Sequence, residues 1–187
     1  MTATHPTDLC AQARLVARIA GGLYVLNTVT SLFSFYGPKN LLSHFSGLVA
    51  TAAYIAVVVL FYVLFKPVSG KIALLAAAAG MAGNAMSLLS AFHVVQFRMI
   101  FMAYFGLYCA LIGYLIYQST FLPRILGALM ALAGLGYLTF LWPPLGKFLT
   151  PYNLIPGALG EWSLMIWLLV KGVDQQRWNE QYNNAGR

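Results

Sequence analysis

The stretch LVATAAYIAVVVLFYVLF, Leu48–Phe65, decides the fold class of this chain. It contains no charged residue, and a helix needs about 20 mainly apolar residues to cross the hydrocarbon core of a bilayer. Further runs of similar character are separated by Pro, Gly and charged residues. We therefore expect an all-α, polytopic transmembrane bundle of six helices that forms a single domain over residues 1–187. The predicted spans are Ile19–Tyr36, Leu48–Phe65, Ile72–Val95, Met99–Tyr117, Ile125–Trp142 and Leu154–Val170.

The composition also indicates an integral membrane protein. Of the 187 residues, 60% are hydrophobic and 8% are charged, and the mean hydropathy is +0.76. Soluble globular domains carry about 25% charged residues, so this chain has too few charges to cover a water-facing surface. The basic residues behind the net charge of +7 stand singly between apolar runs, which argues against a nucleic-acid-binding protein.

Neither the cysteines nor the histidines form a recognisable metal or redox motif. Cys10 and Cys109 lie far apart without ligand spacing, so we expect no disulfide and no metal site. His44 and His93 also lack a second ligand at suitable spacing, which disfavours haem and metal binding. No cofactor is predicted. The N-terminal lead-in is polar and has no cleavage site after a short apolar core, so we expect an uncleaved first span.

The basic residues predict the orientation of the bundle. Six spans place both termini on one side, and cytoplasmic segments carry an excess of Lys and Arg. The side opposite the termini is expected to hold Lys39, Arg98 and Lys147. We therefore predict that both termini lie in the cytoplasm. The basic residues on the side of the termini are Arg14, Arg18, Lys66, Lys71, Arg124, Lys171, Arg177 and Arg187.

Two segments have less distinct signals. HVVQFR, His93–Arg98, contains neither Gly nor Pro. We predict a tight turn there, because one helix from Ile72 to Tyr117 would be too long for a bilayer. The polar tail after Val173 is expected to be partly frayed.

Small residues four positions apart predict where helices pack closely, because they let two backbones approach. We expect the third, fourth and fifth spans to pack in this way. The pairs are Ala76 and Gly80, Ala79 and Gly83, Gly106 and Ala110, and Gly127 and Ala131.

Polar side chains gather in the outer half of the predicted bundle. Glu161 lies about 10 Å below the outer end of the sixth span, and other spans carry polar groups at similar depth, including Tyr24, Ser34, Thr51 and Tyr137. The inner half is almost entirely apolar, which disfavours a continuous ion path. We predict a polar chamber in the outer half, with His44 and His93 near its mouth. The residues expected to contact a bound molecule are Asn27, Ser31, Tyr54, Asn84, Ser87, Tyr104, Tyr108 and Trp162.

Glu161 itself has two possible roles, which the sequence leaves open. It lies within PGALGEWSLMIWLLVKG, Pro156–Gly172, where an ionised carboxylate costs about 2.5 kcal/mol or more. An apolar environment favours the neutral acid, which makes Glu161 a candidate general acid. Alternatively, a protonated Glu161 bridges helices as structural glue. The partners expected for that bridge are Asn27, Ser31, Asn84 or Ser87, and Arg98 is the one basic residue within imaginable reach.

Three stretches resemble a known family. They are ARIAGGLYVLNTV (Ala17–Val29), GYLIYQSTFLPRILGALMALAGLGYL (Gly113–Leu138) and PGALGEWSLMIWLLVKGV (Pro156–Val173). They are similar to the uncharacterised bacterial domain-of-unknown-function family four-three-eight-six, which comprises small six-helix membrane proteins. The resemblance implies six spans and the bacterial inner membrane, but no activity and no catalytic residues. The external loop HVVQFRM is shorter than the resemblance leads us to expect, which speaks against a loop-borne external site.

Four classes of function fit these observations. The leading one is binding of a hydrophobic or amphipathic molecule in the outer-half chamber, with Glu161 as polar anchor and membrane lipid around it. The second is a membrane-embedded isomerase or cyclase of a terpenoid, sterol or lipid, in which Glu161 donates a proton and aromatic faces stabilise a cation. A transporter or channel ranks lower, because the sequence shows no inverted repeat and no intramembrane charge pair. The fourth is a structural subunit that binds another membrane protein or a second copy of itself.

Overall fold

The computed structural model describes residues 6–38, 40–91 and 98–185. Within these residues, six helices are long and apolar enough to cross a membrane. The predicted all-α fold with six membrane-spanning helices is therefore confirmed. The first two helices begin earlier than the predicted spans, because their polar leading residues are also helical. The helices are α1 (Pro6–Tyr36), α2 (Leu41–Phe65), α3 (Gly70–Ala91), α4 (Arg98–Gln118), α5 (Arg124–Leu138), extended by the 3-10 turn η1 (Thr139–Leu141), and α7 (Ile155–Val170).

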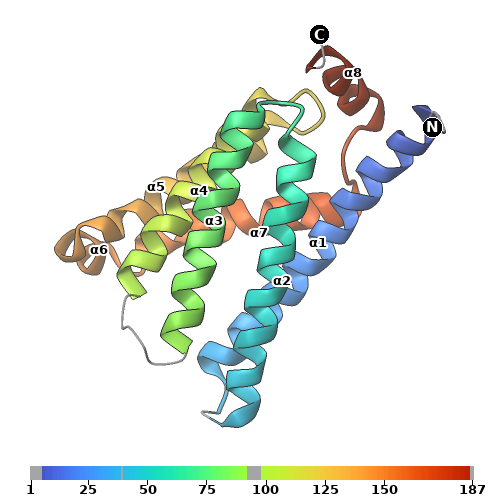
Figure 1. Ribbon diagram of the computed structural model, residues 1–187. Coiled ribbons are helices and arrows are strands. Elements are labelled where there is room, and N and C mark those ends of the chain that lie inside the picture. The colour runs from blue at the N-terminus through green and yellow to red at the C-terminus, as the bar shows by residue number, and fades with distance from the viewer. Residues whose placement is uncertain (1–5, 39, 92–97, 186–187) are drawn as a thin grey trace.

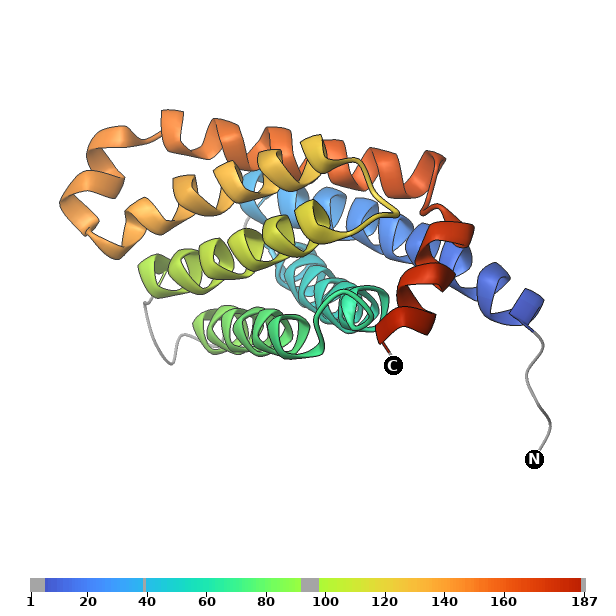
Figure 2. The ribbon, with the colours of Figure 1, turned by 90° about the horizontal axis from the view of Figure 1, so that it is seen from above.

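These helices form a closed ring. Each packs against the next along the chain, and α7 returns to pack against α1. Figure 2 shows α7, α5, α4 and α3 following one another across the bundle. Both termini lie at the same end, which is at the top of Figure 1. A Cβ atom on Gly21 would lie 2.8 Å from the backbone nitrogen of Leu169, so α1 and α7 touch backbone to backbone. This closure brings residues from the two ends of the sequence together.

The contact between α4 and α5 is built on glycine, as the spacing of small residues predicts. A Cβ atom on Gly113 would lie 2.5 Å from the backbone nitrogen of Ala131, and one on Gly134 would lie 2.6 Å from that of Ala110. A side chain at either glycine would therefore force the backbones apart. On α3, a Cβ atom on Gly80 would meet the side chains of Val58 and Tyr108 at 2.9 and 3.1 Å. The third and fourth spans thus also pack closely.

Local signals in the sequence explain where several helices begin and end. The Asn40 side chain accepts a hydrogen bond of 3.1 Å from the Ser43 backbone and so caps the start of α2, as expected of an N-cap asparagine. The helix α5 starts directly after Pro123, whose ring excludes it from a helix interior. The turn predicted at HVVQFR falls mostly on residues 92–97, which lie outside the described residues.

The connection between α5 and α7 is folded. It contains the short helix α6 (Pro143–Leu149) and the 3-10 turn η2 (Tyr152–Leu154). The buried side chain of Asn153 donates a hydrogen bond of 2.9 Å to the Thr139 hydroxyl. This bond ties the connection back to the end of α5.

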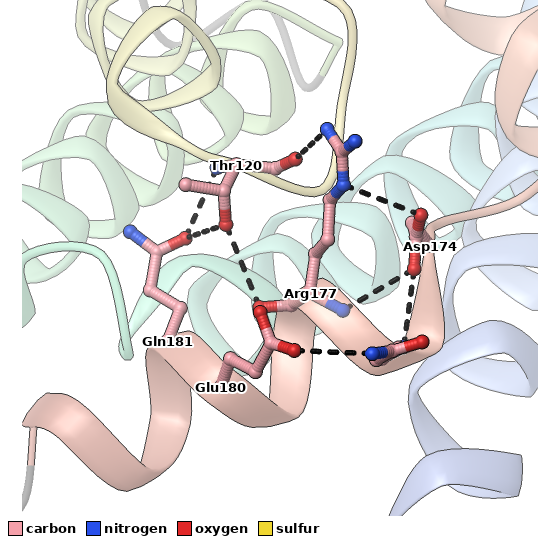
Figure 3. A network of polar contacts seen from close by, with 6 residues as sticks. Thr120, Asp174, Arg177, Glu180 and Gln181 are labelled. Atoms are coloured by element: carbon pink, nitrogen blue, oxygen red, sulfur yellow. Dashed lines mark hydrogen bonds and ion pairs between the residues drawn. The ribbon is translucent and has the colours of Figure 1, made fainter.

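The prediction that the tail frays is wrong over α8 (Gln175–Ala185). The indole of Trp178 is buried, and its nitrogen donates a hydrogen bond of 3.0 Å to the backbone carbonyl of Leu64 in α2. On the exposed side of α8, Gln181 accepts a hydrogen bond from the Thr120 backbone, and Arg177 donates one to the Thr120 carbonyl (Figure 3). The polar composition of this segment led to the wrong prediction, because a single buried tryptophan holds α8 against α2.

Candidate functional site

Glu161 lies on α7 and is half-buried where α1, α5 and α7 meet. The Tyr24 hydroxyl of α1 donates a hydrogen bond of 3.0 Å to one carboxyl oxygen. The Tyr137 hydroxyl, near the end of α5, donates a hydrogen bond of 2.6 Å to the other. The shorter distance is typical of a hydroxyl that donates to a carboxylate. Glu161 therefore links three helices through one carboxyl group.

A glycine makes room for one of these bonds. Gly157 precedes Glu161 by one helical turn, so the two residues lie on the same face of α7. A Cβ atom on Gly157 would overlap the hydroxyl end of Tyr137. The phenol of Tyr137 thus occupies the space that a side chain at position 157 would fill.

Aromatic rings connect the two tyrosines around the inside of the bundle. Tyr54 of α2 packs edge-on against Tyr24, with ring centroids 5.8 Å apart. Phe105 of α4 lies between Tyr54 and Tyr137, at centroid distances of 5.6 and 5.0 Å. With the two hydrogen bonds to Glu161, these contacts close a circuit through five helices. Tyr108 joins it through Tyr54, at 5.9 Å. We call these side chains the Glu161 cluster: Tyr24, Tyr54, Phe105, Tyr108, Tyr137 and Glu161.

Two hydroxyls of the Glu161 cluster have no hydrogen-bond partner among the described residues. Tyr54 is 7% exposed and Tyr108 is 1% exposed, and both hydroxyl oxygens are buried. The two side chains are polar neighbours, with ring centroids 5.9 Å apart. A buried hydroxyl without a partner costs about 1–3 kcal/mol. These two groups are therefore suited to hydrogen-bond a polar group that enters the cluster.

No cation neutralises Glu161 within the part of the chain that the structure describes. The ion pair found there joins Arg177 to Asp174 at 3.6 Å and does not involve Glu161. The side chain of Arg98, the basic residue considered from the sequence, lies outside what the structure describes. Among the described residues, the carboxyl group is held by the hydroxyls of Tyr24 and Tyr137.

The structure brings together some of the predicted site residues and separates others. Tyr54 and Tyr108 belong to the Glu161 cluster. Tyr104 and Trp162 face outward, with 37% and 50% of their surface exposed. Tyr104 instead lines a separate apolar hollow of about 500 Å³ beside Leu107 and Phe140.

The bridging partners expected for Glu161 need correction. Asn84 is buried but donates its amide to the Gly80 carbonyl of its own helix, at 2.8 Å. The Ser31 hydroxyl donates to the Asn27 side chain on the same helix, at 3.4 Å, and Ser87 is half-buried on α3. The bridge is made by Tyr24 and Tyr137, because short polar side chains readily satisfy themselves on their own helix.

Sequence reasoning did not identify Phe105 and did not single out Tyr24 and Tyr137 from the other polar residues at that depth. A usable signal for Tyr137 is Gly157, the small residue one turn before the acid. His44 is exposed on the first turns of α2, and His93 lies outside the described residues. Among the described residues, no three His, Cys, Asp or Glu side chains gather as metal ligands do.

Comparison with known proteins places the chain in a family. A family model described as "Domain of unknown function (DUF4386)" matches residues 82–172, a range that includes Tyr108, Tyr137 and Glu161. A protein of Archaeoglobus fulgidus, named only "Uncharacterized protein", is 33% identical over 130 residues, which is 63% of this chain and 76% of that protein. No solved structure matches the chain. The chain belongs to the domain-of-unknown-function family DUF4386.

Proposed function

We propose that this multi-pass membrane protein binds a hydrophobic or amphipathic molecule whose polar group meets Glu161. The observation that carries the proposal is the half-buried carboxyl group of Glu161, held by Tyr24 and Tyr137 inside a membrane-spanning bundle. Intramembrane acids are costly and commonly serve function. A purely structural acid needs only the two tyrosines, whereas the ring contacts of Tyr24 lead on to two further buried hydroxyls that lack partners among the described residues, those of Tyr54 and Tyr108.

The hydrogen-bonding capacity of the cluster indicates the chemistry of the ligand. A carboxyl group has acceptor positions on both oxygens, and the two tyrosine hydroxyls occupy one on each oxygen. The hydroxyls of Tyr54 and Tyr108 add two groups that can donate or accept. A ligand with a hydroxyl or amine group on an apolar body satisfies these positions. The apolar body would remain among aromatic rings and lipid.

The orientation that we propose places the termini in the cytoplasm and the protein in the bacterial inner membrane. Arg14, Lys66, Lys71 and Lys171 lie toward the end of the termini, in agreement with the positive-inside rule. Glu161 follows the start of α7, Ile155, by about 9 Å at about 1.5 Å per residue. The anchor then lies in the outer half of the membrane.

A second candidate is an isomerase or cyclase in which Glu161 protonates the substrate. The observation in its favour is that a row of aromatic rings starts at the acid, since Tyr24, which hydrogen-bonds Glu161, is followed by Tyr54 and Phe105 at centroid distances under 6 Å. Aromatic faces stabilise cations. Trp162 and Tyr104 face outward, so they are not part of this second proposal.

Carbodiimide labelling tests whether a molecule occupies the site. The chain has four acidic residues, so peptide mass spectrometry resolves each one. We expect an apolar carbodiimide to modify Glu161 in delipidated protein, and an extract of the native membrane to protect it when added back. A water-soluble carbodiimide should modify the exposed Asp174 and Glu180 with or without extract. Equal labelling of Glu161 in both preparations would contradict the proposal.

A further inference from the structure

A second, unrelated site lies at the end of the bundle that carries the termini. A hollow of about 490 Å³ opens where α1, the connection from α4 to α5, the end of α7 and the start of α8 meet. The side chains that line it include Arg14, Thr120, Trp167, Lys171, Asp174 and Arg177.

The backbone fixes the walls of this hollow. Gly172 has a φ of 69°, a conformation that favours glycine, and it turns the chain from α7 toward α8. A Cβ atom there would lie 3.1 Å from Cγ of Arg14, so the stem of Arg14 packs over the turn. The Asp174 backbone then donates a hydrogen bond of 3.2 Å to the Phe121 carbonyl. The basic side chains are therefore presented by a folded surface.

The hollow has an excess of positive charge. Asp174 accepts hydrogen bonds from the backbones of Gln176 and Arg177, at 3.1 and 3.2 Å, and its other oxygen lies 3.6 Å from Nε of Arg177 (Figure 3). Asp174 and Arg177 thus neutralise each other. Arg14 and Lys171 have no acidic partner within the described ranges. Arg14 and Lys171 are therefore the two unpaired cations among the lining residues.

The hollow adjoins the end of α7, one of the membrane-capable helices, and this position corresponds to the level of lipid head groups. Lys171 directly follows Val170, the last residue of α7, and its ammonium group lies 4.6 Å from the centre of the Trp167 ring. Tryptophan and lysine are enriched at this boundary. Exposed apolar residues stand close in sequence to the lining residues: Leu15 follows Arg14, Val170 precedes Lys171, and Ile125 is two residues after Pro123. They offer acyl chains a surface next to the two cations.

We propose that this hollow binds the phosphate group of an anionic phospholipid from the leaflet on the side of the termini. Arg14 and Lys171 contact the phosphate, and Trp167 packs at the glycerol level. Basic pockets between membrane helices suit such head groups, and each charge contributes about fivefold to affinity. The inference is independent of the function proposed for Glu161.

The test is binding of phosphatidylglycerol to the full chain in detergent, measured by native mass spectrometry. The double variant Arg14→Gln with Lys171→Gln is expected to lose about 25-fold in affinity. The charge-preserving pair Arg14→Lys with Lys171→Arg should retain most binding. The matched control is Lys66→Gln with Lys71→Gln, which removes two exposed charges at the same end and should change little. Equal losses in the test and control pairs, or no loss in either, would overturn the proposal.

If the variant Arg14→Gln with Lys171→Gln does not fold, a footprinting experiment on the unmodified chain tests whether the hollow binds the lipid. Phosphatidylglycerol should protect Lys171 from an amine-reactive reagent and leave Lys66 and Lys71 reactive, whereas phosphatidylcholine should protect none of them. Equal protection of the three lysines would contradict the site. Inorganic phosphate distinguishes the two sources of a phosphate group: if it protects Lys171 as well as the lipid does, the site takes a free anion and the lipid proposal is wrong.

Discussion

Gly113→Ala is expected to destabilise the bundle by about 2 kcal/mol or more, because the new methyl group has no space. Its Cβ atom would lie 2.5 Å from the Ala131 nitrogen and 2.8 Å from the Gly127 carbonyl oxygen. These are backbone atoms, so relief requires that α4 and α5 separate. Overpacking of this kind costs about 1–3 kcal/mol, and occasionally more, even where side chains can adjust. The measurement is the free energy of unfolding in mixed micelles.

Gly22→Ala is the matched control for this variant. Gly22 also lies within a membrane helix, but a Cβ atom there meets nothing within 4 Å. Alanine is the better helix former by about 0.5–1 kcal/mol, so this variant should be neutral or slightly more stable. If both substitutions destabilise the protein equally, α4 and α5 are not in backbone contact.

Tyr137→Phe is expected to destabilise the protein by about 1–3 kcal/mol, because it leaves an oxygen of Glu161 without its donor. In a double-mutant cycle with Glu161→Gln we expect a coupling energy of about 1 kcal/mol. Tyr24→Phe should show a smaller coupling, since its bond to Glu161 is longer, at 3.0 Å against 2.6 Å. The measurement is the free energy of unfolding of each single and double variant in mixed micelles.

Tyr104→Phe serves as the control for these substitutions, because Tyr104 faces outward on α4. It should show no coupling to Glu161→Gln. Additive effects for Tyr137→Phe and Glu161→Gln would mean that the hydroxyl and the carboxyl group do not interact.

The membrane helices were predictable from the sequence because a bilayer imposes a minimum length of apolar helix. Runs such as Leu48–Phe65 meet it without ambiguity. The contact between α4 and α5 was predictable because each helix carries small residues four positions apart, Gly106 and Ala110 on α4 and Gly127 and Ala131 on α5. The docking of α8 was not, since Trp178 binds a carbonyl in α2 that lies far away in sequence.

The candidate site was only partly predictable. Glu161 stands out because it is the one acid in its apolar run, but its partners depend on how each helix is rotated. Both lipid and protein interior are apolar, so the sequence of α7 does not reveal that Trp162 faces outward. Asn84 looked like a bridging residue, yet it hydrogen-bonds within its own helix. The role of Tyr137 depends on the space above Gly157, which requires the packed structure.

The central claim is that Glu161 anchors a bound hydrophobic or amphipathic molecule. The most direct test is native mass spectrometry, with extraction and identification of small molecules, on protein purified from its own membrane. Three proteins are compared: the unmodified chain, Glu161→Gln, and Glu180→Gln as a control at an exposed acid on α8. We predict that a defined molecule copurifies with the unmodified chain and with Glu180→Gln, and is depleted or chemically altered in Glu161→Gln. The same bulk phospholipid in all three proteins, with no other molecule, would contradict the claim and leave Glu161 as a structural link between α1, α5 and α7.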